Sequence, residues 1–215
     1  MNYSIILLDF PMVFLSQAHA IFQTDNTILN MGKHQSKMKP STMGDLRSVT
    51  QFSDAEIIEI HKCFLKHTHS GLITLEEFET MYKMFFPYGD ASAFAKHVFR
   101  TFDTNGDNYI DFKEFLCALT ITSKGKTDEK LKLAFNMYDI DKDGFISQGE
   151  MLEIIISTAK MVQVMVNEST TEKRMAKIFK QMDTNRDGQI SLEEFNEGAQ
   201  HNPGVCKIYK YFPPQ

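Results

Sequence analysis

Three segments of twelve residues carry oxygen-bearing side chains at the same spacing. They read DTNGDNYIDFKE from Asp103, DIDKDGFISQGE from Asp139 and DTNRDGQISLEE from Asp183. Each has Asp or Asn at its positions 1, 3 and 5 and Glu at position 12. A calcium ion takes about six to eight oxygen ligands, and a loop of about twelve residues between two helices supplies them from these side chains and the backbone carbonyl at position 7. The spacing therefore predicts three calcium-binding loops.

The predicted ligands have the same roles in all three loops. Positions 1, 3 and 5 and the carbonyl at position 7 each provide oxygen, and the glutamate at position 12 binds bidentately. Mg²⁺, which also prefers oxygen ligands, is a candidate occupant in the resting state. Isolated Asp-x-Asp pairs usually belong to turns and helix caps, but three copies with a glutamate at the same distance favour calcium. The predicted metal ligands are Asp103, Asn105, Asp107, Tyr109, Glu114, Asp139, Asp141, Asp143, Phe145, Glu150, Asp183, Asn185, Asp187, Gln189 and Glu194.

Such loops pair, so three of them imply a fourth unit, which the segment around Gly71 supplies. Aligning Gly71 with position 6 puts Lys66 at position 1 and Glu77 at position 12. The lysine ammonium has no acceptor and repels a cation, so we predict that this unit does not bind calcium. His67 and His69 have no Cys or carboxylate neighbour at metal-ligand spacing and are interpreted as solvated loop residues. This inactive loop is the first in chain order; the loops from Asp103, Asp139 and Asp183 are the second, third and fourth.

Positions 6 and 8 of each loop have requirements of their own. Position 6 must turn sharply, and Gly144 and Gly188 meet this demand. Asn108 replaces glycine in the second loop; asparagine tolerates the left-handed region better than most residues, so we expect this loop to bind as well. The residue at position 8 is expected to pack against the partner loop through a short β-contact. These residues are Ile110, Ile146 and Ile190.

The loops begin near residues 66, 103, 139 and 183, a period typical of stacked helix-loop-helix units. We therefore predict an all-α fold of two lobes, each made of two paired units. The polar, glycine-bearing stretch 123–127 is the expected hinge between them. The predicted divisions are an N-terminal extension 1–30, a basic arm 31–50, an N-lobe 51–122, a C-lobe 128–200 and a C-terminal tail 201–215.

Composition excludes several classes of function. The chain has 215 residues, 42% of them hydrophobic, and a net charge of −5. Much of the acidity lies in the loops and no basic stripe suits a phosphate backbone, so we predict no nucleic-acid partner. Three cysteines without metal spacing favour a reducing, cytoplasmic compartment. The sequence has no nucleophile elbow, glycine-rich phosphate loop or zinc-binding helix, which predicts that the protein is not an enzyme.

Aromatic residues and methionine are abundant, with 18 Phe, 7 Tyr and 13 Met. Core packing is an equally good interpretation of any one of them. As a set, however, the aromatic residues of the N-lobe exceed what two short helix pairs easily bury. They favour an apolar groove that calcium exposes to an amphipathic helix of a target protein. The predicted groove residues are Ile60, Phe64, Phe78, Tyr82, Phe85, Phe86 and Phe115.

Longer stretches resemble a known family. FFPYGDASAFAKHVFRTFDTNGD, FNMYDIDKDGFIS and STTEKRMAKIFKQMDTNRDGQISLEEF are similar to the neuronal calcium sensor family of recoverin-like EF-hand proteins, and most to its visinin-like, hippocalcin and neurocalcin branch. The likeness runs from Met31 to about Pro203 and includes a disabled first loop. It implies an N-myristoylated switch, in which calcium releases the acyl chain to a membrane and the vacated groove binds a receptor, cyclase, kinase or channel.

The resemblance places acylation at Gly32, in the pattern Met-Gly-x-x-x-Ser that starts at Met31. Acylation needs this glycine exposed by removal of an initiator methionine, yet Gly32 is internal in the chain as written. Residues 1–30 therefore have two explanations: an upstream start with Met31 as the working initiator, or an isoform whose apolar leader replaces the lipid. This leader is too short and interrupted to span a bilayer. The lysines available for anionic lipid are Lys33, Lys37 and Lys39.

The leading hypothesis is a cytoplasmic calcium sensor that associates reversibly with membranes and regulates a membrane-associated target. A passive calcium buffer and a constitutive regulatory subunit of a channel or phosphatase are the alternatives. A buffer exposes little apolar surface on binding calcium, and a fixed subunit stays with its partner regardless of calcium. Calcium-dependent exposure of the groove separates the three.

Overall fold

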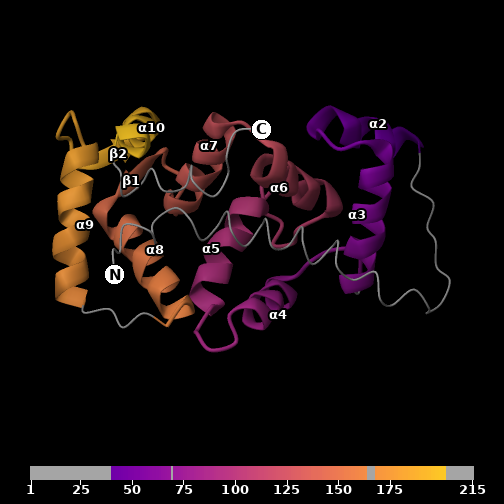
Figure 1. The fold of residues 1–215 in the computed structure, drawn as a ribbon, viewed down its shortest axis with the longest axis horizontal. Coiled ribbons are helices and arrows are strands. Elements are labelled where there is room, and N and C mark those ends of the chain that lie inside the picture. The colour runs from indigo at the N-terminus through magenta and orange to yellow at the C-terminus, as the bar shows by residue number, and fades with distance from the viewer. Residues whose placement is uncertain (1–39, 69, 164–167, 202–215) are drawn as a thin grey trace.

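The computed structural model describes residues 40–68, 70–163 and 168–201 (Figure 1). Within these ranges the chain forms nine α-helices and two short strands, which confirms the expected all-α fold of helix-loop-helix units. The extension 1–30, Gly32 with its neighbouring lysines, His69 and residues 202–215 lie outside the described residues. The elements are α2 (Pro40–Val49), α3 (Asp54–His67), α4 (Leu75–Phe85), α5 (Ser92–Phe102), α6 (Phe112–Lys124), α7 (Thr127–Tyr138), β1 (Phe145–Ser147), α8 (Gln148–Met161), α9 (Glu168–Met182), β2 (Gln189–Ser191) and α10 (Leu192–His201).

Capping boxes fix the starts of many of these helices. In such a box the N-cap side chain accepts from the backbone N–H three residues on, and a glutamate at that place accepts from the N-cap N–H. Ser53 and Glu56 form one at the start of α3, with Ser53 N donating to Glu56 Oε2 at 2.7 Å. The helices that leave the first three loops begin in the same way, at the N-caps Thr74, Asp111 and Ser147. In these last three boxes the glutamate is also the residue at position 12 of the loop, namely Glu77, Glu114 and Glu150.

The loops meet in pairs, as the apolar residue at position 8 predicted. Ile73 and Ile110 exchange backbone hydrogen bonds of 2.9 Å and join the first loop to the second. β1 and β2 pair antiparallel with Ile146 opposite Ile190, and join the third loop to the fourth. All four isoleucines are buried. We call the unit pair α3–α6 the N-lobe and the pair α7–α10 the C-lobe.

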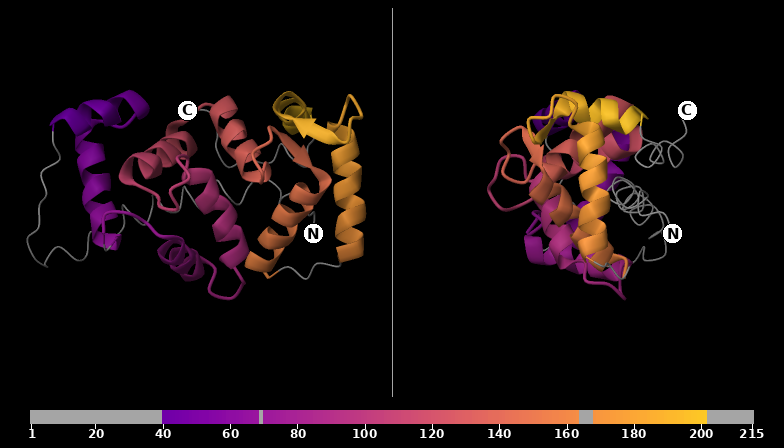
Figure 2. Two further views of the ribbon diagram at one scale, coloured as in Figure 1. Left: turned by 180° about the vertical axis from the view of Figure 1, so that it is seen from behind. Right: turned by 90° about the vertical axis from the view of Figure 1, so that its left-hand side faces the viewer.

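The lobes follow one another along the long axis of the molecule (Figure 1 and Figure 2). α9 forms one end and α2 with α3 the other, while α5 lies near the centre. The connection between the lobes is shorter than the predicted hinge 123–127, because α6 continues to Lys124 and α7 begins at Thr127. Only Gly125 and Lys126 lie between the two helices.

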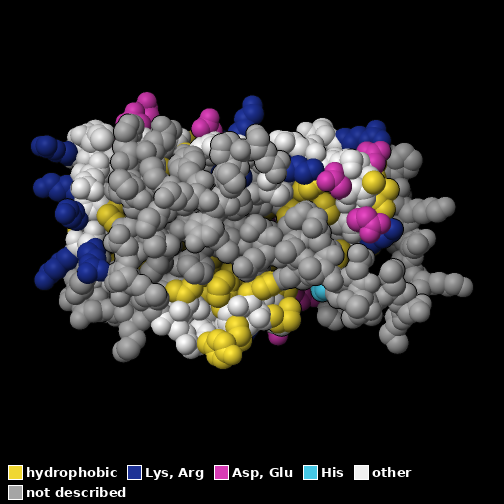
Figure 3. Space-filling view, viewed as in Figure 1, with side chains coloured by type: hydrophobic (Ala, Val, Ile, Leu, Met, Phe, Trp, Pro, Cys, Tyr) yellow, Lys and Arg dark blue, Asp and Glu magenta, His cyan; other side chains and the backbone are white. Residues whose placement is uncertain are grey.

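One apolar region and one basic region stand out on the surface. Figure 3 shows hydrophobic side chains over α4 and the turn that follows it, and basic side chains over α9. The most exposed large apolar residues, Tyr88 at 83% and Met84 at 66%, belong to the first region. No helix in the described ranges is long and apolar enough to cross a membrane.

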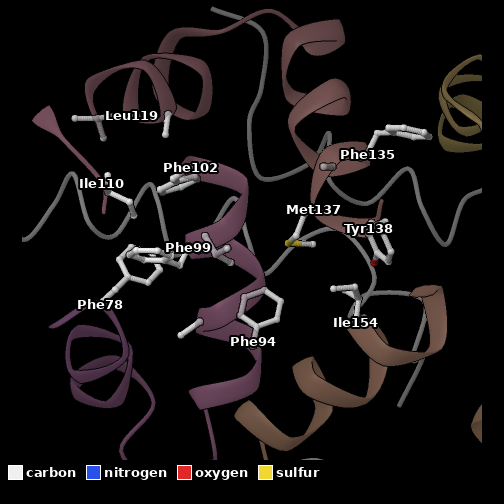
Figure 4. Packing of buried hydrophobic residues seen from close by; sticks show 14 of the residues in the cluster. Phe78, Phe94, Phe99, Phe102, Ile110, Leu119, Phe135, Met137, Tyr138 and Ile154 are labelled. Atoms are coloured by element: carbon white, nitrogen blue, oxygen red, sulfur yellow. The ribbon is translucent and has the colours of Figure 1, made fainter. Parts of the chain in front are cut away.

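One hydrophobic core extends through both lobes, and α5 lies within it. Most of the circumference of α5 is buried, and Ala93 and Lys96 lie on its exposed face. In Figure 4, Phe99 lies with Phe78 of α4, whereas Phe94 lies toward Met137 of α7 and Ile154 of α8. The ring centroids of Phe78 and Phe99 are 5.7 Å apart. α5 belongs to the N-lobe and packs directly on the C-lobe, so the division into lobes does not separate two cores.

Candidate metal centres

The third loop holds a cluster of carboxylates. Oxygens of Asp139, Asp141 and Asp143 all lie within 4.8 Å of one another. Burial raises the pKa of Asp139, and the neighbouring carboxylates of Asp143 and Glu150 act in the same direction. Asp139 Oδ1 is buried without a hydrogen-bond partner. A buried carboxylate oxygen without a partner is unfavourable, and a cation within the loop would remove this cost.

The fourth loop repeats this arrangement. Asp183 also has one buried oxygen without a hydrogen-bond partner, Oδ1, while its Oδ2 accepts from Gly188 N at 3.1 Å. Asn185 Nδ2 donates to Asp187 Oδ2 at 2.8 Å, which holds the side chains at positions 3 and 5 together. The donor set of both loops therefore fits a cation that prefers oxygen, as calcium does.

The second loop has the same types of ligand, but both carboxylate oxygens of its first aspartate accept hydrogen bonds. Asp103 Oδ1 accepts from Gly106 N at 2.8 Å and from Asp107 N at 3.1 Å, and Oδ2 accepts from Asn108 N at 3.0 Å. Asn105 Nδ2 donates to Asp107 Oδ2 at 3.1 Å, as its counterpart does in the fourth loop. A cation that enters this loop competes with backbone donors for both oxygens of Asp103.

The backbone at position 6 turns through the left-handed region in all three loops. φ is 66° at Asn108, 89° at Gly144 and 87° at Gly188, so the expectation that Asn108 replaces glycine there is confirmed. After this turn, the N–H at position 7 donates to the aspartate at position 5, at 2.8 to 2.9 Å in every loop. The residues at position 7, whose carbonyls are the predicted ligands, are Tyr109, Phe145 and Gln189.

The glutamate at position 12 closes each loop through both of its oxygens. Glu194 Oε1 accepts from Thr184 N at 3.0 Å and Asn185 N at 3.2 Å, while Oε2 accepts from Ser191 N at 3.0 Å. Burial alone would raise the pKa of Glu194, but its hydrogen bonds together lower it to about 2. The carboxylate is therefore charged at neutral pH and lies at the loop. The corresponding hydrogen bonds in the second and third loops go to Glu114 and Glu150.

The first loop keeps the fold of the others without their ligands. Gly71 has a φ of 79°, and Glu77 completes a capping box with Thr74. Lys66, at the place of the first ligand, lies inside α3, and Thr68 is the C-cap of that helix. Positions 1 to 9 of this loop contain no carboxylate residue. The geometry is that of a loop which pairs with its neighbour, and the predicted loss of calcium binding is consistent with its residues.

Comparisons with known proteins agree with this geometry. A family model for an EF-hand domain pair matches residues 128–200, and one for an EF-hand domain matches residues 94–125. Neuronal calcium sensor 1 of Lymnaea stagnalis is 45% identical over 181 residues, which cover 82% of this chain and 95% of the relative. The chain belongs to the neuronal calcium sensor family. Recoverin of Homo sapiens is 38% identical over 190 residues, covering 85% of this chain and 95% of recoverin.

Visinin of Gallus gallus, a further member of the neuronal calcium sensor family, is 34% identical over 85% of this chain and 99% of its own length. These relatives confirm the family resemblance found in the sequence, and the EF-hand matches indicate calcium binding. The placement in the visinin-like, hippocalcin and neurocalcin branch stays a prediction.

The residues predicted to form the target groove lie together in a closed part of this family member. The rings of Phe64 and Phe115 are 5.3 Å apart between centroids, and those of Phe78 and Tyr82 are 5.1 Å apart. An opening of this region by calcium therefore stays a prediction. Five of the predicted residues are buried, namely Ile60, Phe64, Phe78, Tyr82 and Phe115, and two are half-buried, Phe85 and Phe86.

Two polar residues of α5, His97 and Arg100, were not among the predicted site residues. Both reach the C-lobe, and Arg100 Nη2 donates to the carbonyl oxygen of Met137 at 2.9 Å. His97 is 5% exposed. Residue type alone gave no signal for them, because α5 also contains Lys96, which is an ordinary exposed cation.

Proposed function

We propose that the protein is a calcium sensor that binds three Ca²⁺ ions, at its second, third and fourth EF-hands, and regulates a membrane-associated target. The proposal rests on the buried, unpartnered oxygens of Asp139 and Asp183, each at position 1 of a loop with further oxygen ligands. Bound calcium supplies the positive charge that compensates these carboxylates. The ligands are those predicted from the sequence at positions 1, 3, 5, 7 and 12, with Mg²⁺ as an occupant in the resting state.

A sensor differs from a buffer because it couples binding to a change of shape. In the third loop we assign this coupling to Glu150. Its Oε1 accepts from Ile140 N at 2.7 Å and from Asp141 N at 3.3 Å. To become a bidentate ligand, the carboxylate has to leave these N–H groups and turn into the loop. Glu150 lies in the first turn of α8, so this movement would reorient α8 relative to α7.

The same movement in the second loop would open the N-lobe, because Glu114 lies in the first turn of α6. We propose that the groove residues are then offered to an amphipathic helix of a receptor, cyclase, kinase or channel. The exposed apolar residues Met84 and Tyr88 beside the closed groove support this assignment. The protein would act by binding rather than as an enzyme, and without a nucleic-acid partner.

We further propose that the protein is cytoplasmic and associates reversibly with membranes. A chain that starts at Met31 would expose Gly32 for myristoylation. One myristoyl chain gives only marginal membrane affinity, so a second signal is needed. The basic residues Lys33, Lys37 and Lys39 would provide it on an anionic surface.

Calorimetry tests the sensor proposal. Titration of chelator-treated protein with CaCl₂ is expected to count three ions, and an apolar dye is expected to fluoresce more strongly with calcium than with chelator. Replacing the position-12 glutamate of one active loop by Gln should remove one ion, whereas Glu77→Gln, the matched change in the first loop, should leave three. Four ions would contradict the inactivity of the first loop. Three ions without any change in dye fluorescence would establish a buffer instead.

Sedimentation with vesicles tests the membrane proposal. The full chain and a chain starting at Met31 are expressed with an N-myristoyl transferase and mixed with phosphatidylserine-containing vesicles. The shorter chain should sediment only with calcium, and less at high salt. Gly32→Ala in the shorter chain is the control that keeps every lysine and removes the acylation site. Equal, calcium-independent sedimentation of the full and shorter chains would refute the acyl switch and favour residues 1–30 as the anchor.

A further inference from the structure

α5 carries two side chains across the boundary between the lobes. Arg100 Nη2 donates to the carbonyl oxygen of Met137 at 2.9 Å. Met137 lies in the last turn of α7, two residues before Asp139, the first ligand of the third loop. The guanidinium of an N-lobe helix is thus attached to the backbone that leads into a C-lobe calcium site.

The second contact lies on the other side of the same loop. His97 Nε2 is 3.5 Å from Glu153 Oε1, and Arg100 Nη1 is 3.4 Å from His97 Nδ1. Glu153 belongs to α8, three residues after Glu150, the last ligand of the third loop. The two α5 side chains therefore contact both helices that flank the third loop, α7 before it and α8 after it.

The charge of Arg100 acts on the loop itself. Its burial lowers the pKa of the guanidinium, while the carboxylates of Glu153, Asp139 and Glu150 act in the opposite direction. An arginine stays protonated under these conditions. Two of these carboxylates, Asp139 and Glu150, are proposed calcium ligands. A positive charge that interacts favourably with them competes with a calcium ion for the same negative charge.

We propose that Arg100 is an interlobe positioning residue: it lowers the calcium affinity of the third loop, and calcium in that loop weakens the attachment of α5 to α7 and α8. The second statement follows from the first, because a coupling between two binding events is reciprocal. This inference rests on the proposed function in one respect, since it requires that the third loop binds calcium. It adds the means by which a C-lobe site communicates with the lobe that contains the groove.

The test isolates the third loop. In a parent that carries Glu114→Gln and Glu194→Gln, calorimetry with CaCl₂ at low salt measures the third loop alone. Adding Arg100→Gln is expected to raise its calcium affinity about two- to fivefold, the size measured for charge pairs that water partly screens. The difference should shrink at about 1 M KCl, where the screening length is about 3 Å. If Arg100 acted through packing alone, the difference in calcium affinity between the parent and the Arg100→Gln variant would not depend on salt.

Two controls separate charge from shape. Arg47→Gln removes the same charge from an exposed residue of α2, whose guanidinium pairs with Asp54, and should leave the affinity unchanged. Arg100→Lys keeps the charge and should restore an affinity close to that of the parent. An Arg100→Gln affinity that is equal to or lower than that of the parent would overturn the proposal. A parent that binds no calcium at all would instead overturn the proposed function at this loop.

Hydrogen exchange gives a second measurement that needs no change at Arg100. In the parent, calcium is expected to speed the exchange of the α5 amides from His97 to Thr101, because their attachment to the C-lobe loosens. Calcium-induced protection of these amides would contradict the inference, whether or not the Arg100→Gln variant folds.

Discussion

Replacing Glu194 by Gln tests how far one side chain serves both the fold and the metal site. In the structure the carboxylate accepts five hydrogen bonds: Oε1 from Thr184 N, Thr184 Oγ1 and Asn185 N, and Oε2 from Ser191 N and Ser191 Oγ. A glutamine of the same shape has one oxygen and one NH₂ group. Whichever way its amide turns, the NH₂ group faces at least one backbone N–H that has lost its acceptor.

The expected loss of stability follows from these contacts. A buried donor left without an acceptor costs about 1–3 kcal/mol, and loss of a negative charge at a helix N-terminus adds about 0.3–1 kcal/mol. We therefore expect calcium-free Glu194→Gln to lose about 2 kcal/mol of its free energy of unfolding. For a chain of this size the midpoint of thermal unfolding should fall by about 4–8 °C. In the fourth loop, one bidentate anionic ligand becomes a neutral monodentate one, so calcium affinity there should fall at least about a hundredfold.

Thermal unfolding in chelator measures the first effect and calorimetric titration the second. Glu193→Gln is the matched control, because Glu193 has the same charge, is adjacent to Glu194, is exposed and is not a predicted ligand. This control should change stability by less than about 0.5 kcal/mol and keep all three ions. Glu194→Gln protein that binds three ions with unchanged affinity would refute the ligand assignment. A loss of one ion in both variants would show that net charge, rather than ligation, was responsible.

Three other substitutions have expected outcomes. Burial, with the nearby cations Arg100 and Lys96, lowers the pKa of His97 from 6.5 to about 4. Between these two pH values only the unfolded chain takes up the proton, so the free energy of unfolding should fall by up to about 1.4 kcal/mol for each pH unit of acidification. In urea unfolding, His97→Gln should reduce this dependence of stability on pH. A Cβ on Gly89 would lie 1.8 Å from the carbonyl oxygen of Met161, so Gly89→Ala should cost about 1–3 kcal/mol in thermal unfolding, whereas Gly44→Ala, with nothing within 4 Å, should not destabilise. Asn108→Gly relieves a φ of 66° and should raise the calcium affinity of the second loop a few-fold, measured by calorimetry; a weaker affinity would contradict this.

The loops could be predicted from the sequence because their chemistry is local. Twelve consecutive residues contain the ligands, the turn at position 6 and the capping glutamate, so the spacing alone indicates how they fold. Asn108 shows how far this reasoning extends: its left-handed φ of 66° follows from its place in the loop. The pairing of Ile146 with Ile190 was predictable for the same reason, because each loop presents one apolar residue at one position.

The contacts between the lobes could not be predicted in this way. The stretch 123–127 has the composition of a hinge, yet most of it is helical, because α6 and α7 continue toward each other. A glycine after a helix usually serves only to end it, but Gly89 allows the turn after α4 to approach the end of α8. There Asp90 N donates to Lys160 O at 3.2 Å. Such contacts join residues far apart in the chain, and composition does not specify the partner.

α5 explains why calcium in the C-lobe can matter to a groove in the N-lobe. On one side, Arg100 and His97 contact the helices that flank the third loop. On the other, the ring of Phe99 lies 5.7 Å from that of Phe78, a predicted groove residue, between centroids. A helix packed against both lobes does not shift at one of these faces without disturbing the other, because protein interiors are close-packed. Movement of α8 at the third loop therefore has a physical route to the groove through a single rigid helix, independent of the two-residue link between the lobes.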